Sequence, residues 1–469
     1  MEKKKRDKYL LKNTLVFAIG NFGTKFISFF LVPLYTNILS TSDYGTVDLV
    51  STICTVAVPM LSLNIGDAIM RFALDKDANQ EKILSTGMVI LGITSILSLA
   101  LIPFSLLMPA ISSYGIYVYL YTVTLAYSQI FLSYLRGREQ LLHYSIGNII
   151  HTFAIAVSNI ILLVFLHKGI KGYLLAYIIS NIVAAAYAFI TGKIYVIFKR
   201  FNFDIELTKK MAVYSIVLIP NSFMWWIMNS SDRIMVTSMV GVAANGIYAV
   251  AYKVPTLLST VTNVFNNAWF YSAIRENESA DKEEYSNAVY KNMVCTVTLA
   301  AGGLLMLMKP FLRFYVEKEY YLAWQYTPYL VIGFVFMTLG TFLATSYTVN
   351  KDSLGFLISG MVGALVNVIL NFLLIPYFEA AGAAFATCIS YFSVFLFRVF
   401  NTRKYIHLNV FRKKDITGIV ICILMGFSMF LEDKIGQIVL IVEYLIILVL
   451  YREFWLSILM GMKKKLIHR

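Results

Sequence analysis

Residues 13–71 read NTLVFAIGNFGTKFISFFLVPLYTNILSTSDYGTVDLVSTICTVAVPMLSLNIGDAIMR, which is two apolar runs joined by a short polar corner. Each run is long enough to cross the hydrocarbon core of a bilayer, which takes about 20 residues of helix. The first run carries Lys25, with Asn21 and Ser28 about one helical turn away on the same face. A lysine at the centre of a spanning helix costs roughly 2.5–3.5 kcal/mol on insertion scales, so such a side chain normally faces a wet cavity or a partner. The stretch therefore predicts a transporter with a polar, cationic interior.

The composition is typical of a polytopic helical membrane protein. Of the 469 residues, 59% are hydrophobic and only 14% are charged, whereas a soluble globular chain carries about 25% charged residues. The net charge of +14 comes from basic residues in short segments between apolar runs. That distribution is typical of membrane orientation, so we expect no nucleic-acid partner. The four cysteines lie singly in apolar runs without metal-ligand spacing, and we expect them to be core residues.

We expect an all-α fold with about fourteen transmembrane helices, of which the last two are short for complete crossings. The predicted spans are residues 13–36, 45–68, 83–107, 114–134, 144–166, 173–197, 212–238, 243–270, 289–311, 323–348, 354–376, 381–400, 416–431 and 435–454.

The distribution of Lys and Arg predicts which side of the membrane each loop occupies. An even number of spans places both termini on one side. With the termini inside, three of the 40 Lys and Arg residues lie within spans and six lie in outer loops, which leaves 31 inside. The six outer residues are Lys168, Lys171, Lys309, Arg313, Lys318 and Lys434. The positive-inside rule therefore predicts cytoplasmic termini. The longer hydrophilic segments, residues 199–210, 275–285 and 398–415, are expected on the same side.

The two halves of the chain form a weak internal repeat. GYLLAYIIS at residues 172–180 matches GAAFATCIS at residues 382–390, an offset of 210, and Asn159 pairs with Asn371 after a two-residue loop shift. DYGTV at residues 43–47 aligns with ANGIY at residues 244–248, an offset of 201 that pairs Gly45 with Gly246 in the alignment. These matches predict two parallel six-helix repeats with a binding site between them, followed by two additional helices. The expected domains are 1–198, a linker at 199–211, 212–403, and a C-terminal part at 404–469.

Polar residues at helical spacing gather in the first two spans of each proposed half. A cavity lined by these spans would be net basic and would suit a diphosphate, because ammonium and guanidinium groups neutralise phosphate. The candidate substrate-binding residues are Lys25, Lys253, Arg233, Arg71, Asn21, Asp48, Asn229 and Asp232.

Each candidate also has a plainer interpretation. Asp232 and Arg233 lie near the outer end of their span and could be interfacial. Arg71 and Lys253 could extend their side chains to the membrane surface. The asparagines could serve only as contacts between helices.

The pattern at residues 13–50 closely resembles the start of bacterial polysaccharide biosynthesis proteins, the O-antigen and capsule repeat-unit flippases. This family shares a superfamily with multidrug and toxin extrusion antiporters and with peptidoglycan lipid II flippases. The resemblance implies a carrier that moves an undecaprenyl-diphosphate-linked oligosaccharide across the bacterial cytoplasmic membrane by alternating access, driven by a coupling ion (Na+ or H+) or by membrane potential. Lys25 and Lys253 fall where such flippases often carry basic residues.

Two other functions compete with a flippase. A cation-coupled drug antiporter of the same superfamily would normally carry a carboxylate in the first helix, and this span has none. A membrane glycosyltransferase or polymerase would normally carry a large outer loop, and the largest here, near residues 309–322, is small. No HExxH, GxSxG or phosphate-binding GxxxxGK motif is present. We therefore expect a non-enzymatic transporter without a cofactor.

Overall fold

The computed structural model describes residues 23–75, 78–199, 202–277 and 279–467. Every regular element assigned in them is helical. The first described helix covers residues 23–38. The α-helices that follow are α2 (Thr41–Leu61), α3 (Ile65–Ala73), α4 (Gln80–Ser98), α5 (Gly115–Gly137), α6 (Leu141–Asn159), α7 (Gly169–Thr191), α8 (Ile194–Lys199), α9 (Ile205–Met239), α10 (Val242–Arg275), α11 (Lys282–Tyr315), α12 (Thr327–Val349), α13 (Ser353–Asn401), α14 (Lys413–Ser428), α15 (Asp433–Leu450) and α16 (Arg452–Ile467). Short 3-10 or π segments are η1 (Leu99–Leu107), η2 (Ser112–Tyr114), η3 (Ile160–Phe165), η4 (Lys318–Gln325) and η5 (Thr402–Lys404).

The all-α, polytopic fold class is confirmed. Within the described residues, nine helices are long and apolar enough to cross a membrane. One of them, α13, contains two of the predicted spans. Glu379, shortly after Pro376, has left-handed φ (51°), and this kink separates the two spans. The last two spans are indeed short. Their helices α14 and α15 have 16 and 18 residues, roughly 24 and 27 Å at 1.5 Å per residue.

The second predicted span is not one continuous helix. Residues 45–68 are divided between α2 and α3, because Leu63 and Asn64 both have positive φ. Pro59 precedes this break by one turn and lacks the N–H that would continue the helical ladder. The Asn64 side chain donates to Asp67 at 2.9 Å, which supports the new helix start.

Contacts divide the chain into two compact units. Unit 1 is residues 1–226 with 241–246, and unit 2 is residues 227–240 with 247–469. The division falls within α9, whereas the sequence analysis placed the linker earlier, at 199–211. The assignment of six-helix lobes to 1–198 and 212–403 remains a proposal.

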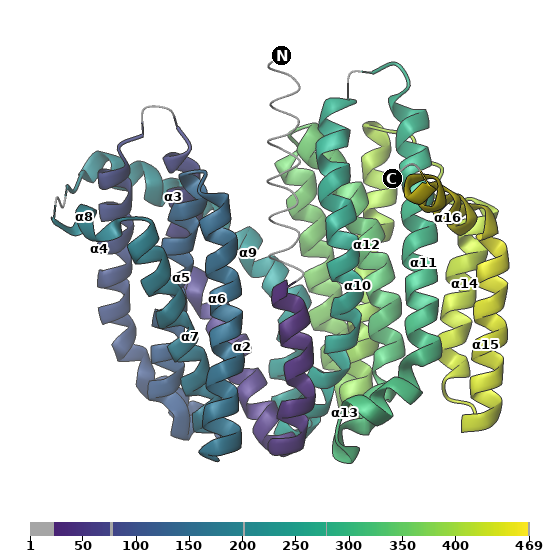
Figure 1. Ribbon diagram of the computed structural model, residues 1–469, viewed down its shortest axis with the longest axis horizontal. Coiled ribbons are helices and arrows are strands. Elements are labelled where there is room, and N and C mark those ends of the chain that lie inside the picture. Colours follow the sequence, from purple (N-terminus) through teal and green to yellow (C-terminus); the bar gives the residue numbers. More distant parts are fainter. Residues whose placement is uncertain (1–22, 76–77, 200–201, 278, 468–469) are drawn as a thin grey trace. The chain divides into compact units, whose positions relative to one another are not determined.

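Unit 1 is built around α5. Helices α3 and α7 pack on it, and α6 packs on α7, so that α4, α5, α6 and α7 run side by side in Figure 1. Its apolar core includes Ile65, Ile69, Leu84, Ile130 and Leu135, all at most 1% exposed.

Unit 2 is built around α12, which is largely buried against α13. Gly333 and Gly340 allow this close approach, since a Cβ on either would contact the α13 backbone at Cys388 or Phe395. Helices α14 and α15 pack on α11. The last helix, α16, lies across the ends of α14 and α15 (Figure 1).

The corners of the proposed repeat have matching backbone conformations. Glu139 and Lys351 both have φ of 57°, and His167 and Glu379 have φ of 49° and 51°. Each pair is 212 residues apart, which is also the offset between Asn159 and Asn371. These shared left-handed positions support an internal repeat.

The glycines of the repeated corners also match. A Cβ on Gly172 would press on Leu162 O at 3.1 Å, and a Cβ on Gly382 would press on Leu374 O at 2.6 Å. The two carbonyls are again 212 residues apart. The glycines are 210 apart because the second loop is two residues shorter.

Candidate functional site

Lys25 lies on the described helix of residues 23–38, and its side chain is exposed. This part of the helix contains no acidic residue. Among the residues that the structure describes, none makes a hydrogen bond or ion pair with Lys25. Asn21, predicted on the same face, lies outside the described residues.

The other two unit 1 candidates have different surroundings. Asp48 on α2 is only 6% exposed and lies within electrostatic range of Tyr177. Arg71, at the end of α3, lies 2.6 Å from Asp75 in an exposed i,i+4 ion pair. This pair compensates the charge of Arg71, as expected of a residue at the membrane surface.

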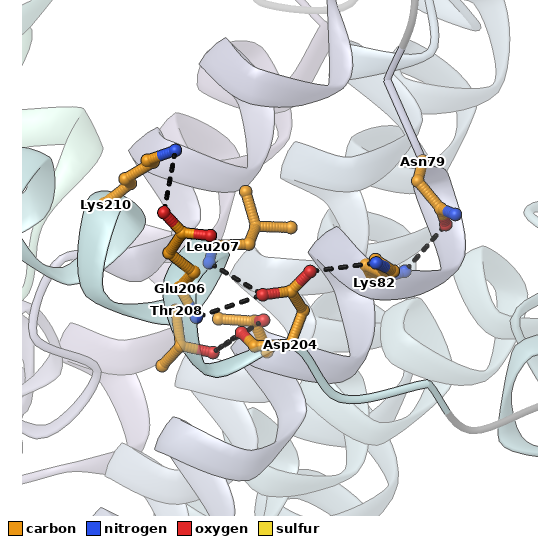
Figure 2. Close-up of polar contacts among 8 residues, drawn as sticks. Asn79, Lys82, Asp204, Glu206, Leu207, Thr208 and Lys210 are labelled. Atoms are coloured by element: carbon orange, nitrogen blue, oxygen red, sulfur yellow. Dashed lines mark hydrogen bonds and ion pairs between the residues drawn. The ribbon is translucent and has the colours of Figure 1, made fainter.

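The start of α9 is anchored to α4 within unit 1, as Figure 2 shows. Asp204 Oδ1 accepts from the backbone N–H groups of Glu206 and Leu207, which caps the helix. Asp204 Oδ2 accepts from Lys82 Nζ at 2.8 Å. The hydrogen bond from Lys82 and the helix cap lower the pKa of Asp204 below its usual value. One turn further along both helices, the hydroxyls of Thr86 and Thr208 are 3.0 Å apart.

In unit 2, Asp232 on α9 lies at the centre of a buried polar network. Its side chain is 1% exposed. The carboxylate accepts hydrogen bonds from Tyr248 Oη on α10 and from Thr387 Oγ1 on α13, the latter at 3.2 Å. A buried carboxylate needs such partners, because burial without them would cost several kcal/mol. The three helices are thus joined at this residue.

The network continues along α13 through two asparagines one turn apart. Asn367 Nδ2 donates to Thr387 Oγ1 at 3.3 Å. Asn367 Oδ1 accepts from Asn371 Nδ2 at 3.0 Å and from Ser231 Oγ at 3.3 Å. Thr387 thus links the two asparagines to the Asp232 carboxylate. Oxygen is the donor atom of hard cations, and a carboxylate is also a proton acceptor.

Two further candidates lie beside the network. Tyr391 Oη donates to Asn229 Oδ1 at 2.7 Å. The Arg233 guanidinium lies 5.1 Å from the centre of the Tyr252 ring, within the range of a cation–π interaction. The structure therefore brings Asn229, Asp232 and Arg233 together.

Lys253 lies further along α10 and is partly buried. It is followed by Val254 and by Pro255, which lies inside the helix.

The sequence analysis missed the network around Asp232. Tyr248, Thr387 and Asn367 carry no charge, and Thr387 is 155 residues away along the chain. Only the i,i+4 spacing of Asn367 and Asn371 could have indicated a polar face on α13.

An apolar cavity of about 220 Å³ lies among α12, the second half of α13, and α14. Its lining includes Tyr329, Phe336, Phe385, Phe392 and Phe427. Several of these rings are also exposed, so the cavity communicates with the surface of unit 2.

Comparison with known proteins gives the family. The model of the polysaccharide biosynthesis protein family matches residues 10–270, more than half of the chain. The chain belongs to the polysaccharide biosynthesis protein family. No curated protein sequence matches it.

Solved structures with the same fold include two groups of transporters. This polysaccharide biosynthesis protein is similar to the lipid II flippase MurJ in an inward closed conformation, with a TM-score of 0.68 and 16% identity over 94% of this chain and 99% of that chain. It is also similar to an inward-facing MATE family transporter of the MOP superfamily, with a TM-score of 0.65 and 13% identity over 82% and 94%. A MOP superfamily transporter from Pyrococcus furiosus gives a TM-score of 0.60 and 14% identity over 84% and 95%. The protein is thus a multi-pass membrane protein with the fold of these transporters.

Proposed function

We propose that this protein is a flippase that moves an undecaprenyl-diphosphate-linked oligosaccharide across the bacterial cytoplasmic membrane for surface polysaccharide synthesis. Membership of the polysaccharide biosynthesis family and the fold in common with a lipid II flippase support this proposal. The observation that carries it is Lys25, an exposed cation on a first helix whose described part has no carboxylate. A charge within the predicted first span is costly, and a diphosphate is a ligand that compensates it.

Lys25, Lys253 and Arg233 would provide positive charge to the diphosphate, with Asn21, Asp48 and Asn229 as polar contacts. Arg71 would contribute its charge only on exchanging its partner Asp75 for the diphosphate. The Asp48 carboxylate would accept hydrogen bonds from sugar hydroxyls. The apolar cavity among α12, α13 and α14 would accept part of the polyprenyl chain, because its aromatic lining matches a hydrocarbon.

We assign Asp232 a role in coupling. Its carboxylate is buried and accepts hydrogen bonds from the Tyr248 and Thr387 hydroxyls, so a proton or a sodium ion would neutralise it. A bulky oligosaccharide would not reach it without opening the network. Asp232 therefore binds the coupling ion in this proposal, and the substrate contacts are left to Lys25, Lys253 and their neighbours.

Both termini are proposed to be cytoplasmic, on the evidence of the Lys and Arg distribution. Single cysteines at position 171 or 434 should then react with a membrane-impermeant maleimide in intact cells, and a cysteine at position 404 should not. The four native cysteines are buried and give a low background.

The second candidate is a cation-coupled drug antiporter, favoured by the fold in common with MATE transporters. The absence of a carboxylate in the described first helix argues against it. A glycosyltransferase or polymerase is a weaker candidate, because the family and the fold are associated with transport.

The test is transfer of a fluorescent undecaprenyl-diphosphate oligosaccharide between the leaflets of proteoliposomes. Wild type should transfer it, and Lys25→Gln and Lys253→Gln should reduce the rate at least tenfold. The exposed Lys171→Gln is the matched control and should transfer at the wild-type rate. If wild type transfers and the two variants equal it, the assigned site is wrong. Uptake of organic cations without lipid transfer would establish the antiporter instead.

A further inference from the structure

Three of the six cations predicted for the outer loops line one cavity in unit 2. This cavity has a volume of about 580 Å³ and lies between the end of α11 and the start of α15. Its cationic lining residues are Lys309, Arg313 and Lys434, and the others are Pro310, Gln437 and Ile438. The positive-inside rule disfavours cations on the outer side, so their convergence calls for a separate explanation.

Aromatic residues hold the two α11 cations in place. The Lys309 side chain is 9% exposed, and its Nζ lies 4.2 Å from the centre of the Trp324 ring. Arg313 Nε donates to Tyr321 Oη at 3.2 Å. Lys309 and Arg313 are four residues apart and thus share one face of α11. Such positioning lowers the entropy cost of binding an anion.

The walls of the cavity are fixed by close packing of α11 and α15. Gly302 and Gly303 leave room for Ile447 and Tyr444, which would contact a Cβ at 3.1 and 3.3 Å. Nearer the cavity, Gln437 Nε2 donates to Met306 O at 3.1 Å. The cavity is therefore formed by two helices that pack closely against one another.

Exposed apolar side chains lie beside the lining residues along both helices. Phe314 is 91% exposed, Ile438 63%, Ile435 56% and Leu307 54%. In a membrane protein such side chains contact lipid tails. A ligand here would meet cations in the cavity and exposed apolar side chains beside it, which matches a phospholipid better than free phosphate.

We propose that Lys309, Arg313 and Lys434 bind the phosphate headgroup of an anionic phospholipid in the outer leaflet. The Arg313 guanidinium provides paired N–H donors for phosphate oxygens, and the two ammonium groups add charge. This site goes beyond the transport function, and only its assignment to the outer leaflet rests on the proposed orientation.

The test is native mass spectrometry of the full-length protein with phosphatidylglycerol and, separately, phosphatidylcholine of the same chain length. Each cation near a headgroup contributes about fivefold in affinity, so neutralising three should weaken phosphatidylglycerol binding about a hundredfold. The pocket variant is Lys309→Gln/Arg313→Gln/Lys434→Gln. The matched control neutralises the other three predicted outer cations, Lys168→Gln/Lys171→Gln/Lys318→Gln, all exposed and outside the cavity. Exposed Lys434→Gln alone should weaken binding about fivefold without changing thermal stability, which separates loss of the site from misfolding.

Several results would overturn the proposal. Equal losses in the pocket variant and the control would show only a general charge effect. Equal binding of phosphatidylcholine would exclude selection of an anion. Displacement of phosphatidylglycerol by millimolar inorganic phosphate would indicate a free-phosphate site. Stronger binding of undecaprenyl phosphate than of phosphatidylglycerol would assign the cavity to the carrier lipid.

Discussion

Substitution Gly246→Ala should destabilise unit 1, because Gly246 and Gly45 face one another where α2 and α10 begin. A Cβ on Gly246 would overlap the carbonyl oxygen of Thr41 and come within 3.0 Å of Gly45 N. Both are backbone atoms, so neither can rotate away. Forcing them apart costs about 1–3 kcal/mol as overpacking. It also strains the 3.0 Å hydrogen bond from Asn245 Nδ2 to Gly45 O, worth about 1 kcal/mol.

The expected cost is therefore about 2–4 kcal/mol, or a fall in melting temperature of about 4–8 °C at roughly 2 °C per kcal/mol. Thermal unfolding in detergent can be followed with a thiol-reactive dye, since Cys54 on α2 is buried. The matched control is Gly92→Ala on α4, where a Cβ meets nothing within 4 Å. The control should be neutral or slightly stabilising, because alanine favours helix. A Gly246→Ala protein as stable as the control would refute the reasoning.

Three further predictions concern carboxylates. The Gly355 N–H and neighbouring side chains lower the pKa of Asp352 from 3.8 to about 2. The ionised carboxylate therefore stabilises the folded protein above pH 3.8, and this stabilisation is lost as pH falls towards 2. The melting-temperature difference between wild type and Asp352→Asn should shrink over that range and stay constant above it. Asp204→Ala should melt below Asp204→Asn, since asparagine can still cap α9 although both lose the ion pair to Lys82; equal melting temperatures would contradict the capping role. Asp232→Leu should cost about 2–4 kcal/mol by leaving buried hydroxyls without an acceptor, whereas Asp232→Asn should fold normally but lose the ion dependence of lipid transfer; ion-dependent transfer by Asp232→Asn would exclude the coupling role.

The sequence predicted the helical architecture well, because a bilayer demands about 20 apolar residues per helix and turns are polar. It also located the break at Glu379, between two predicted spans. It failed at residues 45–68, where the apolar pattern runs through Leu63 although the helix does not. Hydropathy reports burial in lipid and not backbone conformation, and Pro59 indicates an interruption near this point without showing that the helix ends.

Within the site, the sequence identified charged residues and missed their neutral partners. Asp232 stood out because a carboxylate in a membrane span is rare. Tyr248 and Thr387 did not, since hydroxyl side chains are common in such spans. Their roles depend on contacts between helices far apart in sequence, which residue spacing cannot reveal.

Arg398 limits how far the cost of a buried charge can be used as a sign of function. Arg398 lies where the predicted span 381–400 overlaps the predicted hydrophilic segment 398–415, and the structure buries it, with only 2% of it exposed. Its guanidinium donates to Ser359 Oγ at 3.0 Å and to Gly340 O at 2.9 Å and lies 5.5 Å from the Phe356 ring centre.

Arg398 thus meets the cost of burial with fixed protein partners that join α12 to both parts of α13. Lys25 carries the same charge, yet its side chain is exposed and no hydrogen bond or ion pair joins it to the described residues. A cation whose partners are built into the fold is explained by the fold. Lys25 lacks such partners among the described residues, and a ligand is what we propose for it; this difference, more than the presence of charge, makes Lys25 the residue on which to test transport.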